Sequence, residues 1–171
     1  AYNIFACNGI LFNHESPIRG ETFVTKKIIQ GLIRIKNDNQ KKLFLGNLYS
    51  KRDWGHAGDY VEAMWKMLQQ KKPNDYVIAT GKTFTIKEFV NKSANKIGLK
   101  IKWVGKGIKE KAINLKNGKV LIECKNRYFR PVEVDYLKGN AQRAKKILKW
   151  KPKISIDTLI DEMIKHEENL S

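Results

Sequence analysis

The chain has 171 residues, 42% of them hydrophobic, which suits one globular domain with a buried core and excludes a disordered tail. Its 34 Lys and Arg residues against 17 Asp and Glu leave a formal charge of +17, which favours contact with anions. No apolar run approaches the roughly 18 residues of a membrane-spanning helix, and the N-terminus lacks a secretory signal pattern, so a membrane partner is not expected.

The first element is an apolar run over residues 4–12, which predicts a central strand buried on both faces. Because the chain starts at Ala1, within the entry to this strand, we expect it to be a fragment of a longer protein. The polar residues 13–20 include Pro and Gly and predict a loop at the carboxyl end of the strand, where open α/β sheets bind ligands.

A helix is predicted from Glu21 by the apolar residues that recur up to Ile35. A short strand over 42–45 and a second amphipathic helix follow, the latter with the apolar residues Val61, Met64, Trp65 and Leu68. Asp53 or Asp59 is suited to cap or support the N-terminus of this helix.

A strand is predicted at 76–79, and a Thr85-x-x-Glu88 capping box starts a helix that ends at Gly98. Residues 101–104 resemble a strand, and 112–123 form a lysine-rich hairpin about Asn117-Gly118, expected at the periphery. Two helices complete the chain, one from about Asn140 to Trp150 and one after Ser155. The four Trp residues are expected to pack in the core.

Several long motifs then occur in order along the chain. Residues 9–17 read Gly-Ile-Leu-Phe-Asn-His-Glu-Ser-Pro and residues 51–56 read Lys-Arg-Asp-Trp-Gly-His; further motifs cover 19–27, 45–47, 59–65, 130–134 and 150–152. Together they resemble the family of GDP-mannose 4,6-dehydratases across essentially the whole chain, with residues 105–126 the least distinctive.

The resemblance implies an α/β fold that comprises the C-terminal substrate-binding part plus the last strands of a Rossmann-type, NAD(P)-binding, extended short-chain dehydrogenase/reductase. We expect residues 1–20 to end the Rossmann domain and supply a loop to cofactor and substrate. Residues 21–171 are then the nucleotide-sugar-binding domain.

The family converts GDP-mannose to GDP-4-dehydro-6-deoxymannose, a first step toward GDP-fucose, by internal hydride transfer through NADP and loss of water. The family's glycine-rich loop, Thr-x-Glu and Tyr-x-x-x-Lys motifs all precede the matched region. Tyr2 cannot replace the catalytic tyrosine, because Ala6 occupies the position of the lysine. We therefore expect no catalytic residue here and an inactive fragment, whereas full-length members are homo-oligomers.

Two residues are implied as cofactor ligands, His14 and Arg19, and Asn13 as a contact of the substrate diphosphate. Asn13 in an Asx turn and His14 on a nearby carbonyl are the structural alternatives. Glu15 is assigned an ordering role, because the family's catalytic glutamate lies upstream.

The substrate ligands implied by the resemblance are completed by Val24, Lys27, Arg52, Arg130 and Glu133. Val24 and Lys27 share a helix face at i and i+3. Arginine suits a diphosphate because it binds two oxygens at once, and Glu133 suits ribose hydroxyls. The structural alternatives are a solvated Lys27 and local ion pairs of Arg52 with Asp53 or Asp59, or of Arg130 with Glu133 or Asp135.

Two alternatives remain open: another nucleotide-sugar dehydratase, epimerase or reductase of this superfamily, and a basic nucleic-acid-binding module. The second is weaker, because the lysines are spread along the chain without interleaved aromatic residues. Cys7 and Cys124 lie outside any metal-binding spacing, which argues against a zinc site or a disulfide framework and favours a cytoplasmic setting.

Overall fold

A computed structural model describes residue 2 and residues 4–129 and 132–170 of the chain. The helices are α1 (Val24–Lys36), α2 (Ala57–Leu68), α3 (Ile86–Lys96), α4 (Gln142–Ile147) and α5 (Ile156–Glu168), with short 3-10 turns η1 (Gly107–Lys109) and η2 (Asn126–Tyr128). The strands are β1 (Gly9–Leu11), β2 (Asn13–Glu15), β3 (Leu43–Leu45), β4 (Lys51–Arg52), β5 (Trp54–His56), β6 (Tyr76–Ile78), β7 (Phe84–Thr85), β8 (Ile101–Val104), β9 (Lys111–Asn114) and β10 (Val120–Cys124).

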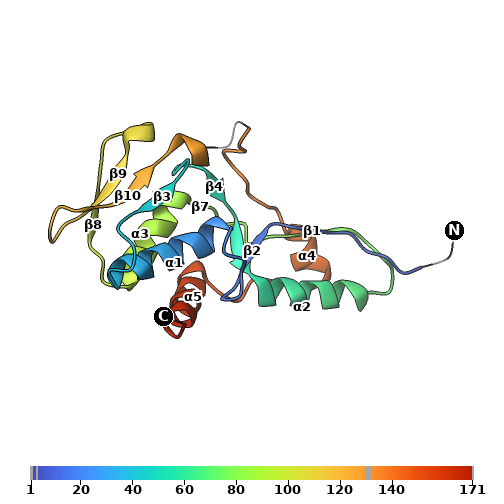
Figure 1. Cartoon of the computed structure of the whole chain (residues 1–171). Coiled ribbons are helices and arrows are strands. Elements are labelled where there is room, and N and C mark those ends of the chain that lie inside the picture. The colour runs from blue at the N-terminus through green and yellow to red at the C-terminus, as the bar shows by residue number, and fades with distance from the viewer. Residues whose placement is uncertain (1, 3, 130–131, 171) are drawn as a thin grey trace.

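The molecule is elongated, with two lobes that have separate hydrophobic clusters (Figure 1). The larger lobe packs α1, α3 and α5 together with the sheet that contains β10. The smaller lobe packs Cys7 and Leu11 against later residues such as Tyr60, Tyr76 and Trp150. Its cluster thus draws on both sides of residue 20, and the domain boundary there stays a prediction about the full-length protein.

The larger lobe contains a four-stranded sheet in the order β3-β10-β9-β8. β10 runs parallel to β3, with Ile122 beside Leu43, and antiparallel to β9. Gly118, at a φ of 70°, turns the hairpin as the Asn-Gly pair predicts. The prediction that this hairpin is peripheral was wrong: β10 is an internal strand and Ile122 is fully buried, because β10 recruits β3 from far upstream.

The smaller lobe is built on β1 and β6, which pair in parallel with Gly9 beside Tyr76. The predicted buried strand over 4–12 is reduced to three residues, and Ile10 is exposed. The physical reason is that β6 is the only partner of β1 in the described part of the chain, so its other edge is open.

The chain changes partner directly after β1. Phe12 N still donates to the Ile78 carbonyl at 3.0 Å, whereas β2 pairs in parallel with β5. Asn13 to Glu15 therefore form a strand rather than the predicted loop, which is limited to residues 16–20. The change places β2 between the two lobes (Figure 1).

Local signals located both ends of α3 and the start of α5. Thr85 and Glu88 form the complete capping box of α3, Gly98 follows its C-cap at a φ of 81°, and Ser155 caps α5. The start at Glu21 was wrong, because Phe23 N donates to the Gly20 carbonyl in a turn and α1 begins at Val24.

Helix α2 buries a different face from the one its sequence suggested. Tyr60, Ala63 and Met67 are buried, whereas Trp65 is 62% exposed and belongs to an outward apolar stripe with Val61, Met64 and Leu68. The prediction that Trp65 packs in the core was therefore wrong for the described chain, although Trp54 and Trp150 are buried.

The N-terminus of α2 is capped neither by Asp53 nor by Asp59. The Nδ1 atom of His56 accepts from Gly58 N, while Asp59 accepts from the backbone of Lys153 and Ile154. Neither carboxylate caps the helix, because long-range backbone donors reach both. Asp59 nevertheless lies in the first turn of α2, where an acidic side chain supports the helix N-terminus as expected.

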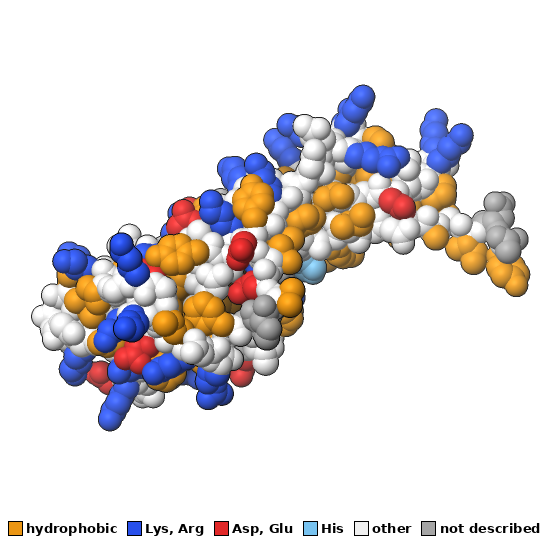
Figure 2. Space-filling model, turned by 90° about the horizontal axis from the view of Figure 1, so that it is seen from above, with side chains coloured by type: hydrophobic (Ala, Val, Ile, Leu, Met, Phe, Trp, Pro, Cys, Tyr) orange, Lys and Arg blue, Asp and Glu red, His pale blue; other side chains and the backbone are white. Residues whose placement is uncertain are grey.

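Lys and Arg side chains are scattered over the face seen in Figure 2 and lie among acidic and apolar side chains. Among the described residues, no helix is long and apolar enough to cross a membrane.

Candidate functional site

A cavity of about 700 Å³ lies where β2, the start of α1 and β4 meet the segment around η2. We call it the larger cavity, because two smaller cavities are described below. It collects five residues predicted as substrate ligands from four separate parts of the sequence: Asn13, Val24, Lys27, Arg52 and Glu133. The sixth, Arg130, lies outside the described residues.

A close backbone approach closes one wall of the larger cavity. A Cβ atom on Gly46 would lie 2.1 Å from the Tyr128 carbonyl oxygen, which is shorter than any non-bonded contact allows. Glycine is therefore required where β3 ends, and it lets residues 127–129 line the cavity.

Arg52 and Glu133 bind each other at the edge of this cavity. Nη2 of Arg52 donates to Oε1 of Glu133 at 3.1 Å, and Nη1 donates to the Val134 carbonyl at 2.6 Å. The backbone prepares this contact, because Lys51 N donates to the Asp135 carbonyl and Leu137 N to the Lys51 carbonyl. The expected local pairs of Arg52 with Asp53 or Asp59 do not form.

The structure separates the adjacent lysines Lys26 and Lys27. Lys26 is buried in an ion pair with Glu167 and donates to the Pro17 carbonyl, which ties α1 to α5. Lys27 lines the larger cavity, and its Nζ atom lies 3.6 Å from the ring centroid of Tyr128. Burial lowers the pKa of the Lys27 ammonium, and the nearby charge of Arg127 lowers it further.

Glu15 is a buried carboxyl in the wall of the larger cavity. Thr25 donates to it at 2.7 Å, and Nε of Arg19 lies 3.2 Å from the same oxygen. Burial raises the pKa of Glu15, against the lowering effects of Thr25, Arg19 and His14. These contacts support the ordering role expected for Glu15, because they join β2 to α1.

A second cavity, of about 340 Å³, contains both predicted cofactor ligands, His14 and Arg19. Asn13 lines this cavity as well as the larger one, so the two are adjacent along β2. Nδ1 of His14 lies 2.9 Å from the Phe12 carbonyl. His14 therefore contacts a nearby carbonyl, which was the expected alternative to a cofactor contact. Since a carbonyl only accepts, this contact places a proton on Nδ1 and leaves Nε2 of neutral His14 as an acceptor.

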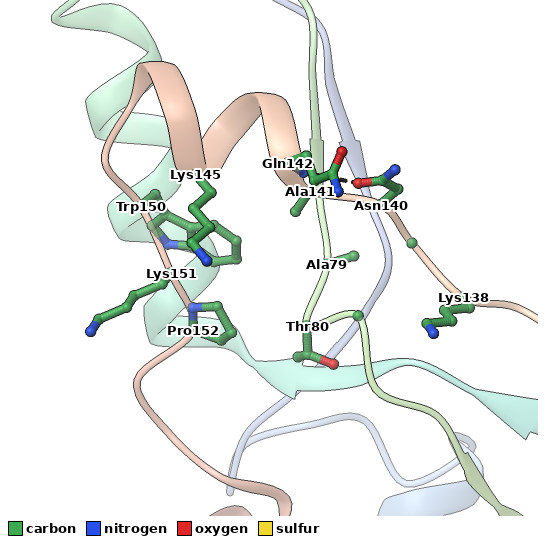
Figure 3. A pocket seen from close by; sticks show the side chains of 12 residues that line it. Ala79, Thr80, Lys138, Asn140, Ala141, Gln142, Lys145, Trp150, Lys151 and Pro152 are labelled. Carbon is green, nitrogen blue, oxygen red and sulfur yellow. Dashed lines mark hydrogen bonds between the residues drawn. The ribbon is translucent and has the colours of Figure 1, made fainter.

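A third cavity, of about 520 Å³, was not expected from the sequence. It lies between residues 79–81 and the segment with Trp150 and Pro152, with Lys138, Lys145 and Lys151 around it (Figure 3). The fully buried Asp53 orders its wall, because the carboxylate accepts from Thr80 N, Thr80 Oγ1, Gly81 N and Gly139 N.

Trp54, Arg127 and Tyr128 also line the larger cavity, although no ligand contact was predicted for them. Arg127 is one of only six arginines in a lysine-rich chain, and this scarcity could have marked it as a candidate anion ligand. No group of His, Cys, Asp or Glu in the described ranges could hold a metal ion.

Comparison with sequences of known proteins places these cavities in a family context. The family model described as GDP-mannose 4,6 dehydratase matches residues 1–163. The GDP-mannose 4,6 dehydratase of Dictyostelium discoideum is 54% identical over 164 residues, which cover 96% of this chain and 46% of that protein. The human GDP-mannose 4,6 dehydratase is 51% identical over 164 residues, which cover 96% of this chain and 44% of the human protein. The chain spans about half the length of the curated relatives it matches.

Solved structures with low sequence identity share the fold. RMD from Pseudomonas aeruginosa complexed with NADPH superposes with a TM-score of 0.75 at 18% identity and covers 95% of this chain and 48% of that one. The dTDP-glucose 4,6-dehydratase of Bacillus anthracis in complex with NAD gives a TM-score of 0.72 at 19% identity, with 95% and 44% covered. These likenesses confirm the α/β fold expected from the sequence.

Proposed function

Because the chain belongs to the GDP-mannose 4,6-dehydratase family, we propose that it is the substrate-binding portion of an enzyme that converts GDP-mannose to GDP-4-dehydro-6-deoxymannose. The observation that carries the proposal is the larger cavity, where Asn13, Lys27, Arg52 and Glu133 face one space. A nucleotide diphosphate sugar needs cations for its phosphates and acceptors for its sugar hydroxyls, and this set supplies both.

The catalytic residues belong, in this proposal, to a part of the enzyme that the chain does not contain. Matches to less than half of each relative support this. So do the open edge of β1 and the outward apolar stripe of α2, because soluble proteins rarely leave such surfaces uncovered.

The second cavity is suited to one side of NADP, which when bound would accept the hydride from the sugar and return it. A space of about 340 Å³ is too small for a whole dinucleotide. The fit of its residues is favourable: Arg19 brings a cation to this cavity, and its Nε is held 3.2 Å from the Glu15 carboxylate, which orients the guanidinium. His14 offers Nε2 as an acceptor. These two residues would hold a phosphate and a hydroxyl of the cofactor.

The full-length enzyme is, by the same proposal, a cytoplasmic homo-oligomer. Cys7 and Cys124 are both free, which is consistent with a reducing compartment. Burial also raises the pKa of the Cys124 thiol, so this group stays protonated.

Nucleotide binding tests the proposal. Trp54 lines the larger cavity, so GDP and GDP-mannose should quench tryptophan fluorescence, and UDP should compete poorly. Trp54→Phe should remove the quench, whereas Trp65→Phe, on the exposed face of α2, should keep it. Equal affinity for UDP and GDP would instead indicate another nucleotide-sugar enzyme, and salt-steep binding of any oligonucleotide would indicate a nucleic-acid-binding module.

Two substitutions test the site separately from the activity. Arg52→Ala and Arg130→Ala should each weaken GDP binding. If both variants bind GDP as the unmodified chain does, the assignment of the larger cavity is wrong even where the family assignment holds.

A further inference from the structure

Two cations in the larger cavity share one aromatic ring. Lys27 Nζ lies 3.6 Å and the Arg127 guanidinium carbon 5.0 Å from the ring centroid of Tyr128. Lys27 comes from the first turn of α1 and Arg127 from η2, so the tertiary fold alone brings them together. Both residues line the cavity.

Neither cation has an acidic partner in the described ranges of the chain. The ion pairs involve many other lysines, including Lys26, Lys87 and Lys92, but not Lys27 or Arg127. The charge of Arg127 contributes to the lowered pKa of Lys27, so the two groups destabilise each other electrostatically. An anion in the cavity would remove this repulsion.

Arg52 differs because its guanidinium is already engaged. Nη1 donates to the carbonyls of Lys51 and Val134, and Nη2 donates to Glu133. An anion at these atoms would have to compete with a carboxylate that is mostly buried. Lys27 and Arg127 present no such competition.

We propose that Arg127 binds the diphosphate of the nucleotide sugar together with Lys27, above the ring of Tyr128. Arg52 then acts mainly as a positioning residue that holds Glu133 at the cavity edge. This inference rests on the proposed function, because it assumes a diphosphate ligand in the larger cavity. It adds a residue that the family resemblance did not supply.

Calorimetric titration of the chain with GDP and with GMP tests the inference. Arg127→Ala should weaken GDP binding by about tenfold or more, because a charge-assisted contact with a phosphate is lost. The affinity for GMP, which has one phosphate fewer, should fall less than the affinity for GDP in this variant. Arg127→Lys should retain part of the affinity, and the matched control Arg34→Ala, which removes an exposed arginine outside this cavity, should bind GDP normally.

A pH profile separates binding from a structural role. Without Arg127, the pKa of Lys27 rises, so the loss of GDP binding at alkaline pH should move to higher pH in Arg127→Ala. In Lys27→Ala, the loss of GDP binding at alkaline pH should disappear. The double variant Lys27→Ala, Arg127→Ala should lose less GDP-binding free energy than the sum of the two single losses. Unchanged unfolding midpoints would establish that each variant folds.

Two results would overturn the inference, and they differ in what they say about function. If Arg127→Ala binds GDP normally while Lys27→Ala or Arg52→Ala binds it weakly, Arg127 is not a ligand and the proposed function stands. If the unmodified chain binds neither GDP nor GDP-mannose, the proposed function fails and this inference fails with it.

Discussion

Arg52 and Glu133 lie 81 residues apart in the sequence and form an ion pair, with Nη2 3.1 Å from Oε1. Both were expected to contact a ligand, yet they pair with each other. Only 14% and 21% of the two side chains are exposed, so water screens the pair weakly. The contact orders the cavity edge before any ligand binds.

Replacing Arg52 by Ala should therefore affect both stability and binding. The change removes the bond to Glu133 and that to the Val134 carbonyl, so we expect the free energy of unfolding to fall by about 1–2 kcal/mol. GDP affinity should fall about tenfold as Glu133 becomes mobile. Urea unfolding and calorimetry measure the two effects, and a variant with unchanged stability would contradict the ordering role.

Replacing Asp53 by Ala should strongly lower the free energy of unfolding. Four donors from three residues would lose a fully buried carboxylate, which predicts a loss of about 3 kcal/mol or more. Asp53→Asn should also be destabilising, since its amide group would face a backbone donor. Urea unfolding should show both losses; a cost below about 1 kcal/mol for Ala would disprove the role.

Gly46→Ala tests the close approach that shapes the larger cavity. The new Cβ atom would meet the Tyr128 carbonyl oxygen at 2.1 Å, so the segment with Arg127 and Tyr128 must shift. We expect GDP affinity to fall about tenfold or more. Gly9→Ala is the matched control, because its Cβ atom would have ordinary contacts of 3.4 Å or longer. Equal GDP affinity in the two variants would argue against the shift.

Trp65 and Trp150 should respond very differently to truncation. Trp65→Ala changes an exposed side chain and should alter the free energy of unfolding by no more than about 0.5 kcal/mol. Trp150→Ala should cost about 3–5 kcal/mol, because it empties a buried site and breaks the bond from Nε1 to the Asp59 carbonyl. Similar losses in denaturant titrations would mean that α2 buries its other face.

The raised pKa of Glu15 predicts a pH-dependent effect of Glu15→Gln. Folded Glu15 holds its proton more tightly than the unfolded chain, so its contribution to stability is present below pH 4.5 and declines as pH rises through the folded pKa. Gln does not titrate. Compared with the unmodified chain, the variant should therefore gain stability between pH 4 and pH 7 in urea unfolding.

Glu88→Gln provides the control of opposite sign for that experiment. A hydrogen bond from Thr85 N lowers the pKa of Glu88, so its contribution is present above pH 4.5 and lost as pH falls through the folded pKa. This variant should be less stable than the unmodified chain at pH 7 and approach it at low pH. If both variants gained, or both lost, stability relative to the unmodified chain as pH rises, the raised pKa of Glu15 and the lowered pKa of Glu88 could not both hold.

The features that the sequence determined by itself are those decided by near neighbours. The Thr85 and Glu88 capping box and the turn at Gly118 formed where expected, and the last helix begins after Ser155 as expected. Each depends on a few adjacent residues, so its geometry is already encoded locally. The ordered motifs likewise identified the family without any structure.

Tertiary structure alone decided which partners those elements meet. β10 is an internal strand because it pairs with β3. Helix α2 buries Tyr60 and leaves Trp65 exposed. Arg52 forms its ion pair with Glu133 rather than with Asp53 or Asp59. Spacing along a helix shows that two apolar faces exist, but not which of them is covered. Long-range pairing also placed Arg127 beside Lys27, because side-chain proximity across the fold depends on the packing of whole elements rather than on sequence distance.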